Sequence, residues 1–441
     1  MTEVTVGVDI GSTSVKALAV DGDGAVLASA RVPHELRAPA ADRLEHDADA
    51  AWRRGVEEAV RQVWSGHDVR GVDVAAMVPS LCAVDGDGRP CTPGLLYGDA
   101  RGAGAAGASP AESGELVGFL RWCASEAPDA AGYWPAQAVA NAALGGEGVL
   151  DTVTAMTAMP LFDGTGWDAA IAGAAGVDPA RLPRVAPGME RAGTVGDAAL
   201  APGTIDALAE QLVAGADGDG DVLVILGTTL ITWAVSAEWR EVPGLWTVPH
   251  TAPGKALIGG PSNAGGLFLT WARGLLGPGG GEPDPTRVPV WTPYVRGERT
   301  PLHDPSRRAG LHDLDLLADA AAVRRAAVEA SGFVVRHHLD LAGVRPERIV
   351  ATGGGVRDES WVAAVADATG LPVDVVAVPE GGALGAAYLA RVAAGLEASA
   401  DDAGRWARTA RRVEPDPRWA GPVAERYERF RDLTGSPQSS P

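Results

Sequence analysis

Two segments of this chain share a pattern of strand, glycine-led turn and strand. The first covers residues 4–20 and turns at Gly11-Ser12-Thr13; the second covers residues 222–235 and turns at Gly227-Thr228-Thr229. Both are rich in β-branched and aliphatic residues, which favour strands, so each is predicted to be a β-hairpin. The repetition in opposite halves of the chain predicts a duplicated fold with two lobes, and coincidence between two short segments is the alternative.

The rest of the chain alternates strands with helices. Residues 49–64 have apolar residues at helical spacing, residues 72–77 and 348–351 form apolar strands, and a helix is expected at residues 359–369. A helix beginning near residue 380 is rich in Gly and Ala, which permits close packing. This alternation is typical of an α/β protein.

Glycine-led turns are suited to binding phosphate. A glycine lets backbone N–H groups approach a phosphate oxygen, and Ser12 and Thr13 add hydroxyl donors, while Asp9 could hold Mg²⁺ through water. A plain hairpin with a polar tip would give the same residues. The chain contains no GxxxxGK[ST] motif, and Gly11 leads into a strand rather than a helix, so neither a P-loop nor a dinucleotide-binding fold is indicated.

Composition excludes some classes of function. With 57 acidic and 37 basic side chains, the formal charge of −20 argues against general attraction to nucleic acid or to anionic membranes. The three cysteines show no metal-binding spacing, and no apolar run approaches the roughly 20 residues of a membrane span. We therefore expect a soluble, cytoplasmic protein with free thiols.

The order of the motifs is more specific than any one of them. The sequence contains DIGSTSVKALAVD, LLYGDAR, GTIDALAEQ, LGTT, PSNAGGLFLTWARGLLG, PYVRGERTPLHDPSRRAGLHDL, ATGGGVRDESWVAAVADATGLPV and EGGALGAAYLA, in that order. Over residues 4–396 this pattern resembles the FGGY family of carbohydrate kinases. The resemblance implies a two-lobed, actin-like ATPase (ribonuclease H-like) fold with a central cleft. We expect a sugar-binding lobe at residues 1–215, an ATP-binding lobe at 216–400, and a C-terminal helix and disordered tail at 401–441.

The resemblance also implies an activity, ATP-dependent phosphorylation of a hydroxyl on a ketose, polyol or sugar acid. Asp206 matches the catalytic base, and its carboxylate could equally cap a helix that starts at Ala207. Asp9 matches the acidic residue associated with Mg²⁺. The expected ATP-binding residues match the family's glycine-rich loops: Gly11, Ser12, Thr13, Gly227, Thr228, Thr229, Asn263, Gly265, Gly266, Gly353, Gly354 and Gly355.

The expected carbohydrate-binding residues depart from the family pattern. Many pentulose kinases of the family carry Gln-Met-His-Gly where this chain has Met77-Val78-Pro79-Ser80, so the histidine is replaced by Pro79. We expect the substrate to be bound or positioned by Ser80, Tyr97, Asp99 and Arg101. The strand expected just before Asp206 is also shortened.

Two alternatives remain at this stage. The chain could be a catalytically silent relative that binds sugar and ATP and serves a regulatory role, although it retains Asp9, Asp206 and both glycine-led turns. It could also be another actin-fold ATPase, such as a chaperone, which the GERTPLHDP and GTIDALAEQ segments disfavour. The expected partner is a small carbohydrate, with a homodimer possible and no nucleic acid or membrane partner.

Overall fold

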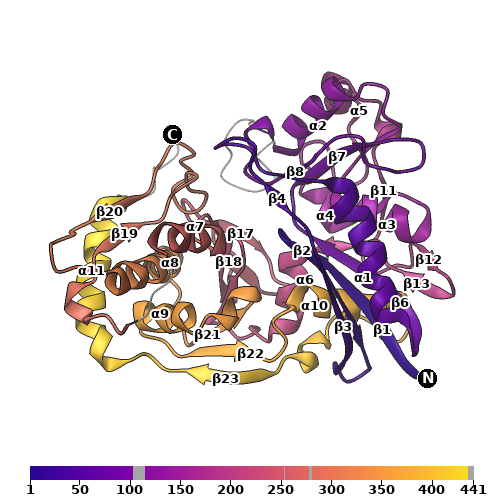
Figure 1. The fold of residues 1–441 in the computed structure, drawn as a ribbon. Helices are drawn as coiled ribbons and strands as arrows, with labels where there is room; N and C mark the ends of the chain where they lie inside the picture. The colour runs from indigo at the N-terminus through magenta and orange to yellow at the C-terminus, as the bar shows by residue number, and fades with distance from the viewer. Residues whose placement is uncertain (103–114, 253, 278–280, 436–441) are drawn as a thin grey trace. The chain divides into compact units, whose positions relative to one another are not determined.

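The computed structural model describes residues 1–102, 115–252, 254–277 and 281–435. The chain forms two compact units: Met1–Val213 with Glu380–Trp406, and Ala214–Pro379 with Ala407–Pro441 (Figure 1). Of the C-terminal tail expected to be disordered, residues 436–441 lie outside the described residues.

The first unit is built on a sheet of strand order β12-β13-β6-β1-β2-β3, with β14 also pairing with β6. As expected, β1 and β2 form an antiparallel hairpin, and β1 pairs in parallel with β6 on its other side. The strands are β1 (Thr2–Ile10), β2 (Ser14–Val20), β3 (Val26–Pro33), β6 (His67–Ala76), β12 (Gly193–Val195), β13 (Ala198–Leu200) and β14 (Thr204–Ile205).

A second, smaller sheet of the first unit has the order β4-β5-β8-β7-β9, and β10 pairs with β11. The strands of the five-stranded sheet are β4 (Leu36–Arg37), β5 (Glu45–His46), β7 (Ser80–Val84), β8 (Gly94–Leu96) and β9 (Gly132–Trp134), and those of the separate pair are β10 (Val149–Asp151) and β11 (Arg184–Ala186). The helical segment expected at residues 49–64 is a π-helix, Asp49–Arg54, followed by α1. The other helices are α1 (Gly55–Trp64), α2 (Glu115–Glu126), α3 (Ala136–Gly145), α4 (Thr152–Met156), α5 (Ala169–Ala174) and α6 (Asp206–Ala214).

Helix α10 (Gly381–Ala393) packs against β1 and β6 of the first unit, although it comes from a late part of the chain (Figure 1). A Cβ atom on Gly7 of β1 would overlap the carbonyl oxygen of Ala383, so only glycine allows this approach. Thr5 Oγ1 donates a hydrogen bond of 2.8 Å to the carbonyl of Ala387. The observed units therefore differ from the expected parts: Glu380–Trp406 belong to the first unit, and the C-terminal segment from Ala407 belongs to the second.

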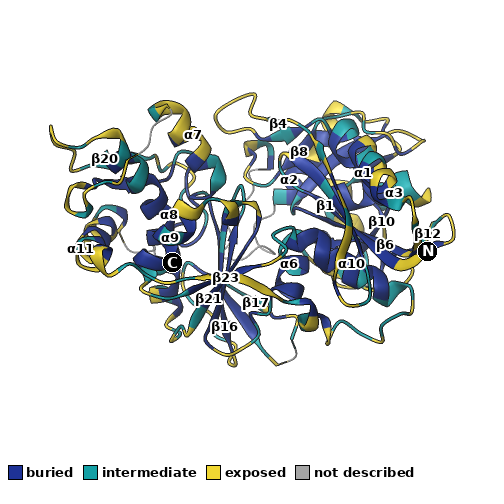
Figure 2. Ribbon diagram, turned by 60° about the horizontal axis from the view of Figure 1, so that its bottom comes forward, coloured by how far each residue is buried: buried dark blue, intermediate teal, exposed yellow. Residues whose placement is uncertain are grey.

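The second unit repeats the topology of the first. Its sheet has the order β17-β18-β16-β15-β21-β22-β23, in which β15 pairs antiparallel with β16 and parallel with β21. The strands are β15 (Asp221–Leu226), β16 (Leu230–Ser236), β17 (Trp246–Pro249), β18 (Ala256–Ser262), β21 (Arg348–Thr352), β22 (Val373–Val376) and β23 (Thr409–Val413). Figure 2 shows β1 and β6 largely buried, as are β15 and β21. The duplication indicated by the two hairpins is confirmed.

In the part of the chain that the structure describes, four α-helices and a β-ribbon complete the second unit. They are α7 (Gly266–Leu276), α8 (Ala320–Ala342), α9 (Glu359–Thr369), α11 (Pro417–Thr434), β19 (Val290–Thr292) and β20 (Gly310–His312). Among the described residues, no helix is long and apolar enough to cross a membrane. The thiols of Cys82, Cys91 and Cys123 are free.

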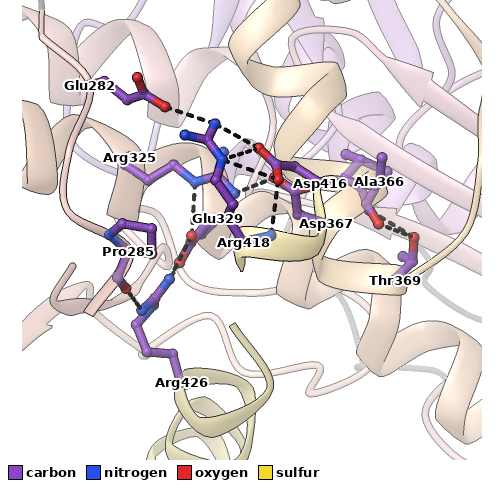
Figure 3. A network of polar contacts seen from close by, with 11 residues as sticks. Glu282, Pro285, Arg325, Glu329, Ala366, Asp367, Thr369, Asp416, Arg418 and Arg426 are labelled. Carbon is purple, nitrogen blue, oxygen red and sulfur yellow. Dashed lines mark hydrogen bonds and ion pairs between the residues drawn. The ribbon is translucent and has the colours of Figure 1, made fainter. Parts of the chain in front are cut away.

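A buried ion-pair network holds the C-terminal helix α11 against α8 and α9 (Figure 3). Glu329 of α8 is 1% exposed and accepts two hydrogen bonds of 2.8 Å from Arg426 of α11 and one of 2.8 Å from Arg325. Arg325 also donates to Asp367 of α9 at 2.7 Å, and the same carboxylate accepts from the backbone N–H of Asp416 at 2.8 Å. Each charge in the network thus has several partners.

Replacing Glu329 by alanine should destabilise the protein because it leaves two arginines without their shared carboxylate. Loss of one partner from a buried ion pair typically costs about 3–5 kcal/mol. The control is Glu147→Ala, which breaks an exposed pair with Arg184 and should cost no more than about 1 kcal/mol. Urea unfolding followed by tryptophan fluorescence would compare them, and equal losses would contradict this account of the network.

Candidate functional site

The tip of the first hairpin is polar and is braced by an ion pair. Asp9 and Lys16 lie opposite each other on β1 and β2, and Lys16 Nζ is 3.0 Å from Asp9 Oδ2. The neighbouring Asp9 carboxylate raises the pKa of Lys16 and outweighs the effect of burial. Asp9 also faces the first turn of α10, where a Cβ atom on Gly382 would lie 3.2 Å from its Oδ1. A carboxylate is favoured there by the helix dipole.

The loop Gly11–Thr13 is hydrogen-bonded by His46, a residue that the sequence did not single out. His46 is fully buried; its Nδ1 accepts a 3.1 Å hydrogen bond from Trp52 Nε1, so its Nε2 carries the proton and donates to the carbonyl of Ser12 at 2.9 Å. Burial, and then the nearby His34, lowers the pKa of His46 to about 4. A lone histidine before a helix gives no sequence signal for this role.

Two of the residues expected on the carbohydrate side, Asp99 and Arg101, form a buried ion pair. Arg101 donates from Nε to Asp99 Oδ1 at 2.8 Å and from Nη2 to Glu45 at 2.6 Å. Asp99 also accepts from the backbone N–H of Leu44 at 2.6 Å. Burial raises the pKa of Asp99, but the hydrogen bonds from Arg101 and Leu44 outweigh it and lower the pKa overall. Both side chains are therefore engaged within the protein.

Ser80 and Tyr97 lie in different surroundings. Ser80 is 1% exposed, and its hydroxyl accepts a 3.1 Å hydrogen bond from the backbone N–H of Ala136 at the start of α3. The hydroxyl of Tyr97 is 3.3 Å from that of Ser12. Of the expected carbohydrate-side residues, Tyr97 is thus the one brought beside the first glycine-led loop.

Asp206 is the first residue of α6 and is partly exposed. Its Oδ1 accepts a 2.7 Å hydrogen bond from the backbone N–H of the next residue, Ala207, and the helix begins one residue earlier than expected. The short strand expected before it is present as two pieces, β13 and β14, which both pair with β6. The carboxylate therefore follows directly from a strand that belongs to the central sheet.

Three glycine-rich segments of the second unit meet at the end of β15. The loop Gly227–Thr229 accepts hydrogen bonds at its carbonyls from the first turn of α7, 2.8 Å from Gly266 N–H to Gly227 and 3.1 Å from Leu267 N–H to Thr228. A Cβ atom on Gly265 would lie 2.5 Å from the carbonyl carbon of Thr229. The structure thus brings the loop Gly227–Thr229 together with the segment that ends at Gly265 and Gly266, both expected to bind ATP.

The remaining glycine-rich segment, residues 353–355, also lies against the end of β15. Gly353 has φ of +86°, and a Cβ atom on it would lie 2.9 Å from the carbonyl oxygen of Leu226. A side chain on Gly355 would also meet that oxygen, at 2.7 Å. Gly354, between them, is exposed. The expected turn is therefore present, and it depends on glycine for both its conformation and its packing.

Asn263 is positioned by a buried carboxylate. Glu298 is 3% exposed and accepts hydrogen bonds from the Asn263 N–H at 2.9 Å and the Ser262 hydroxyl at 2.7 Å. Asn263 in turn donates from Nδ2 to the carbonyl of Gly297 at 3.0 Å. Burial raises the pKa of Glu298 to about 7 despite these hydrogen bonds. The GERTP segment signalled this region, but the sequence did not single out Glu298.

Each hairpin tip by itself offers donors suited to the phosphates of a nucleotide. Backbone N–H groups and hydroxyls at such a tip match phosphate oxygens. Within the described residues no group of three His, Cys, Asp or Glu side chains could hold a metal by itself. Mg²⁺ is usually held by one or two carboxylates, water and substrate phosphates, which a single carboxylate such as that of Asp9 fits.

Comparison with known proteins gives a consistent result. Family models described as the N- and C-terminal domains of the FGGY family of carbohydrate kinases match residues 4–109 and 222–394. The chain is 30% identical to a xylulose kinase of Streptomyces rubiginosus, over 97% of this chain and 93% of that protein. It is 23% identical to a gluconokinase of Bacillus subtilis, over 90% and 88%. The crystal structure of a xylulose kinase from Rhodospirillum rubrum matches with a TM-score of 0.76 and 27% identity, over 98% of both chains.

The buried His46 should make the protein sensitive to acid. Its pKa of about 4 lies below the ordinary value of 6.5, so on unfolding at intermediate pH it takes up a proton that the folded state does not bind. Stability should therefore fall as pH drops from 6.5 towards 4. His46→Gln keeps one donor and one acceptor but cannot titrate, so its urea midpoint should fall less between pH 7 and pH 5. Equal falls in the two proteins would show that His46 does not contribute.

Proposed function

The chain belongs to the FGGY family of carbohydrate kinases, and on this premise we propose that it transfers the γ-phosphoryl group of ATP to a hydroxyl of a small carbohydrate. The observation that carries the proposal is the convergence of three glycine-rich segments at the end of β15, in a chain whose other unit presents a carboxylate at the start of α6. We place the reaction in the cytoplasm, where free thiols persist.

In this proposal the second unit binds ATP. The backbone and hydroxyls of Gly227, Thr228 and Thr229 bind phosphate, the segment from Asn263 to Gly266 lies on the nucleotide side, and Gly353–Gly355 accommodates adenosine. Close packing of glycines supports these roles, because a rigid backbone keeps its N–H groups in place for the ligand.

In the first unit the loop Gly11–Thr13 contributes further phosphate donors. Asp9 would hold Mg²⁺ through water, and the ion would neutralise charge on the phosphate oxygens. The ion pair between Asp9 and Lys16 keeps the carboxylate fixed in place. His46, through its hydrogen bond to Ser12, keeps the loop in place.

Asp206 is the proposed general base. Phosphoryl transfer needs little covalent chemistry from the protein beyond positioning, charge stabilisation and acceptance of the hydroxyl proton. In our scheme the Asp206 carboxylate takes that proton as the acceptor oxygen attacks the γ-phosphorus and the bond to ADP breaks. Its partial exposure leaves it accessible to a substrate.

The acceptor is proposed to be a ketose, polyol or sugar acid. Tyr97 is the best candidate for a direct contact, since its hydroxyl lies beside Ser12. The contacts of Ser80, Asp99 and Arg101 within the protein favour a role in shaping the substrate side. The relatives named xylulose kinase and gluconokinase act on a ketose and on a sugar acid by their names, which fits this class.

Asp206→Asn should lower kcat by about 10²–10⁴-fold, the usual effect of losing a general base. ATP affinity, measured by calorimetry, should stay close to that of the wild type because the amide keeps the shape of the side chain. A coupled assay for ADP would give kcat. Wild-type turnover by the variant would exclude Asp206 as the base.

The same assay separates an active kinase from a catalytically silent relative. If wild-type protein binds ATP but no carbohydrate on a broad panel stimulates ADP release, the silent relative is the correct reading. The retained Asp9, Asp206 and glycine-led loops favour the kinase.

D-xylulose should not be the best substrate. Pro79 stands where many pentulose kinases of the family have a histidine, and it offers no side-chain donor. A site that binds a hydroxyl by hydrogen bonds discriminates strongly, whereas an apolar contact is worth only about 1–3 kcal/mol per methylene. Steady-state kinetics over ketoses, polyols and aldonates would decide. The highest kcat/KM on D-xylulose would refute the inference from Pro79 and leave the kinase assignment intact.

A further inference from the structure

The strand that leads into Asp206 contains a bulge. Leu200 of β13 lies opposite Val72 of β6, and Thr204 of β14 lies opposite Ala75, so one strand advances by four residues while its partner advances by three. The extra residue is accommodated at Gly203, whose φ is +94°. Bulges of this kind interrupt the ladder and redirect the chain, and they are frequent beside active sites.

The backbone groups around the bulge are bound by side chains instead. Asn141 Nδ2 donates to the carbonyl of Pro202 at 2.8 Å, and the N–H of Gly203 donates to Asp73 Oδ1 at 3.0 Å. Gln137 Nε2 donates to the carbonyl of Thr204 at 3.2 Å. The backbone of residues 202–204, which ends two positions before Asp206, is thus bound by the side chains of Asn141, Asp73 and Gln137.

Two of these side chains, Gln137 and Asn141, come from one face of α3, four residues apart, and α3 packs against β6 (Figure 1). Each amide makes a second hydrogen bond to neighbouring backbone, Gln137 to Ala76 at 3.0 Å and Asn141 to Val149 at 2.9 Å. The bulge is therefore tied to the end of β6 and to β10, both fixed parts of the unit.

The three side chains that bind the backbone of the bulge are themselves buried. Asp73 is 1% exposed and the two amides are fully buried. One oxygen of each, Asp73 Oδ2, Gln137 Oε1 and Asn141 Oδ1, has no hydrogen-bond partner among the described residues. Burying an unsatisfied acceptor destabilises a protein, but apolar side chains here would leave the carbonyls of Pro202 and Thr204 and the N–H of Gly203 without these partners. The three side chains therefore satisfy the backbone of the bulge and fix its conformation.

We propose that Gln137, Asn141 and Asp73 are positioning residues that set the location of the Asp206 carboxylate by fixing the bulge before it. The proposal rests on the proposed role of Asp206 as the base. Thr204 and Ile205 lead without a break into α6, so a shift of the bulge is transmitted to the first residue of that helix. The side chains act through the backbone and do not touch the substrate.

The first test is Gln137→Met, which keeps the length of the side chain and removes its donors. We expect kcat on the best carbohydrate to fall about 10–100-fold, since displacement of a reacting group by about 1 Å can cost 10²-fold. The KM for ATP should stay within about twofold, because the ATP-binding segments do not depend on the bulge. A fall in stability alone is controlled by Val423→Ala in α11, a buried position in the apolar core of the other unit, which should lower the urea midpoint but leave kcat unchanged.

A double-mutant cycle separates positioning from general damage. In the Asp206→Asn background, Gln137→Met should lower the residual rate by less than about twofold, because the group it positions is already absent. A fall by the same factor as in the wild type would overturn the proposal. If Asp206→Asn is impaired and Gln137→Met has wild-type kcat, only the positioning role is wrong. If Asp206→Asn has wild-type kcat, the proposed base is wrong as well.

A second pair of variants gives an independent check. Asp73→Asn keeps an acceptor oxygen for the N–H of Gly203 and should retain kcat within about threefold, whereas Asp73→Val removes the acceptor and should reduce kcat as Gln137→Met does. Circular dichroism and the urea midpoint would establish that both variants are folded. Equal kcat values in the two folded variants would contradict a role for this hydrogen bond.

Discussion

Close contact between small residues is the constraint on which both units depend. In the first unit a side chain on Gly7 of β1 would overlap the backbone of α10 at Ala383. On another side of the same helix, Gly385 meets the backbone of α6 at Ala209. Because α6 begins at Asp206, the glycines that bring these elements together also fix the place of the proposed base. In the second unit Gly265 and Gly353 bring backbone segments to the end of β15 in the same way.

The buried titratable side chains near these loops hold backbone groups in place. His46 donates to Ser12, Glu298 accepts from Asn263, and Asp73 accepts from Gly203. Burial disfavours the charged form of each group. It lowers the pKa of His46 to about 4 and raises the pKa of Glu298 to about 7 and that of Asp73 to about 8. A neutral group avoids the cost of a buried charge and still makes the hydrogen bond. We therefore interpret all three as parts of the scaffold that keeps the polar loops rigid.

The sequence was sufficient for the parts of the fold that have local signals. Glycine-led turns between β-branched runs predicted both hairpins, and the family resemblance predicted the architecture, which the comparisons confirm. It could not show that α10 packs on the first unit, because that contact joins residues almost the whole chain apart. It also missed His46, Gln137 and Asn141, since a buried polar side chain looks like any surface one until its backbone partner is known. The roles proposed for the site residues depend on contacts with ligands, so they stay predictions.

The central claim, that the protein transfers a phosphoryl group from ATP to a carbohydrate, is tested most directly by product analysis. Purified protein would be incubated with ATP, Mg²⁺ and the carbohydrate that most stimulates turnover, and the products quantified by mass spectrometry. The account predicts one phosphorylated carbohydrate for each ADP formed, and little ADP without carbohydrate. ADP formed at the same rate with and without carbohydrate, and no phosphorylated carbohydrate, would contradict it.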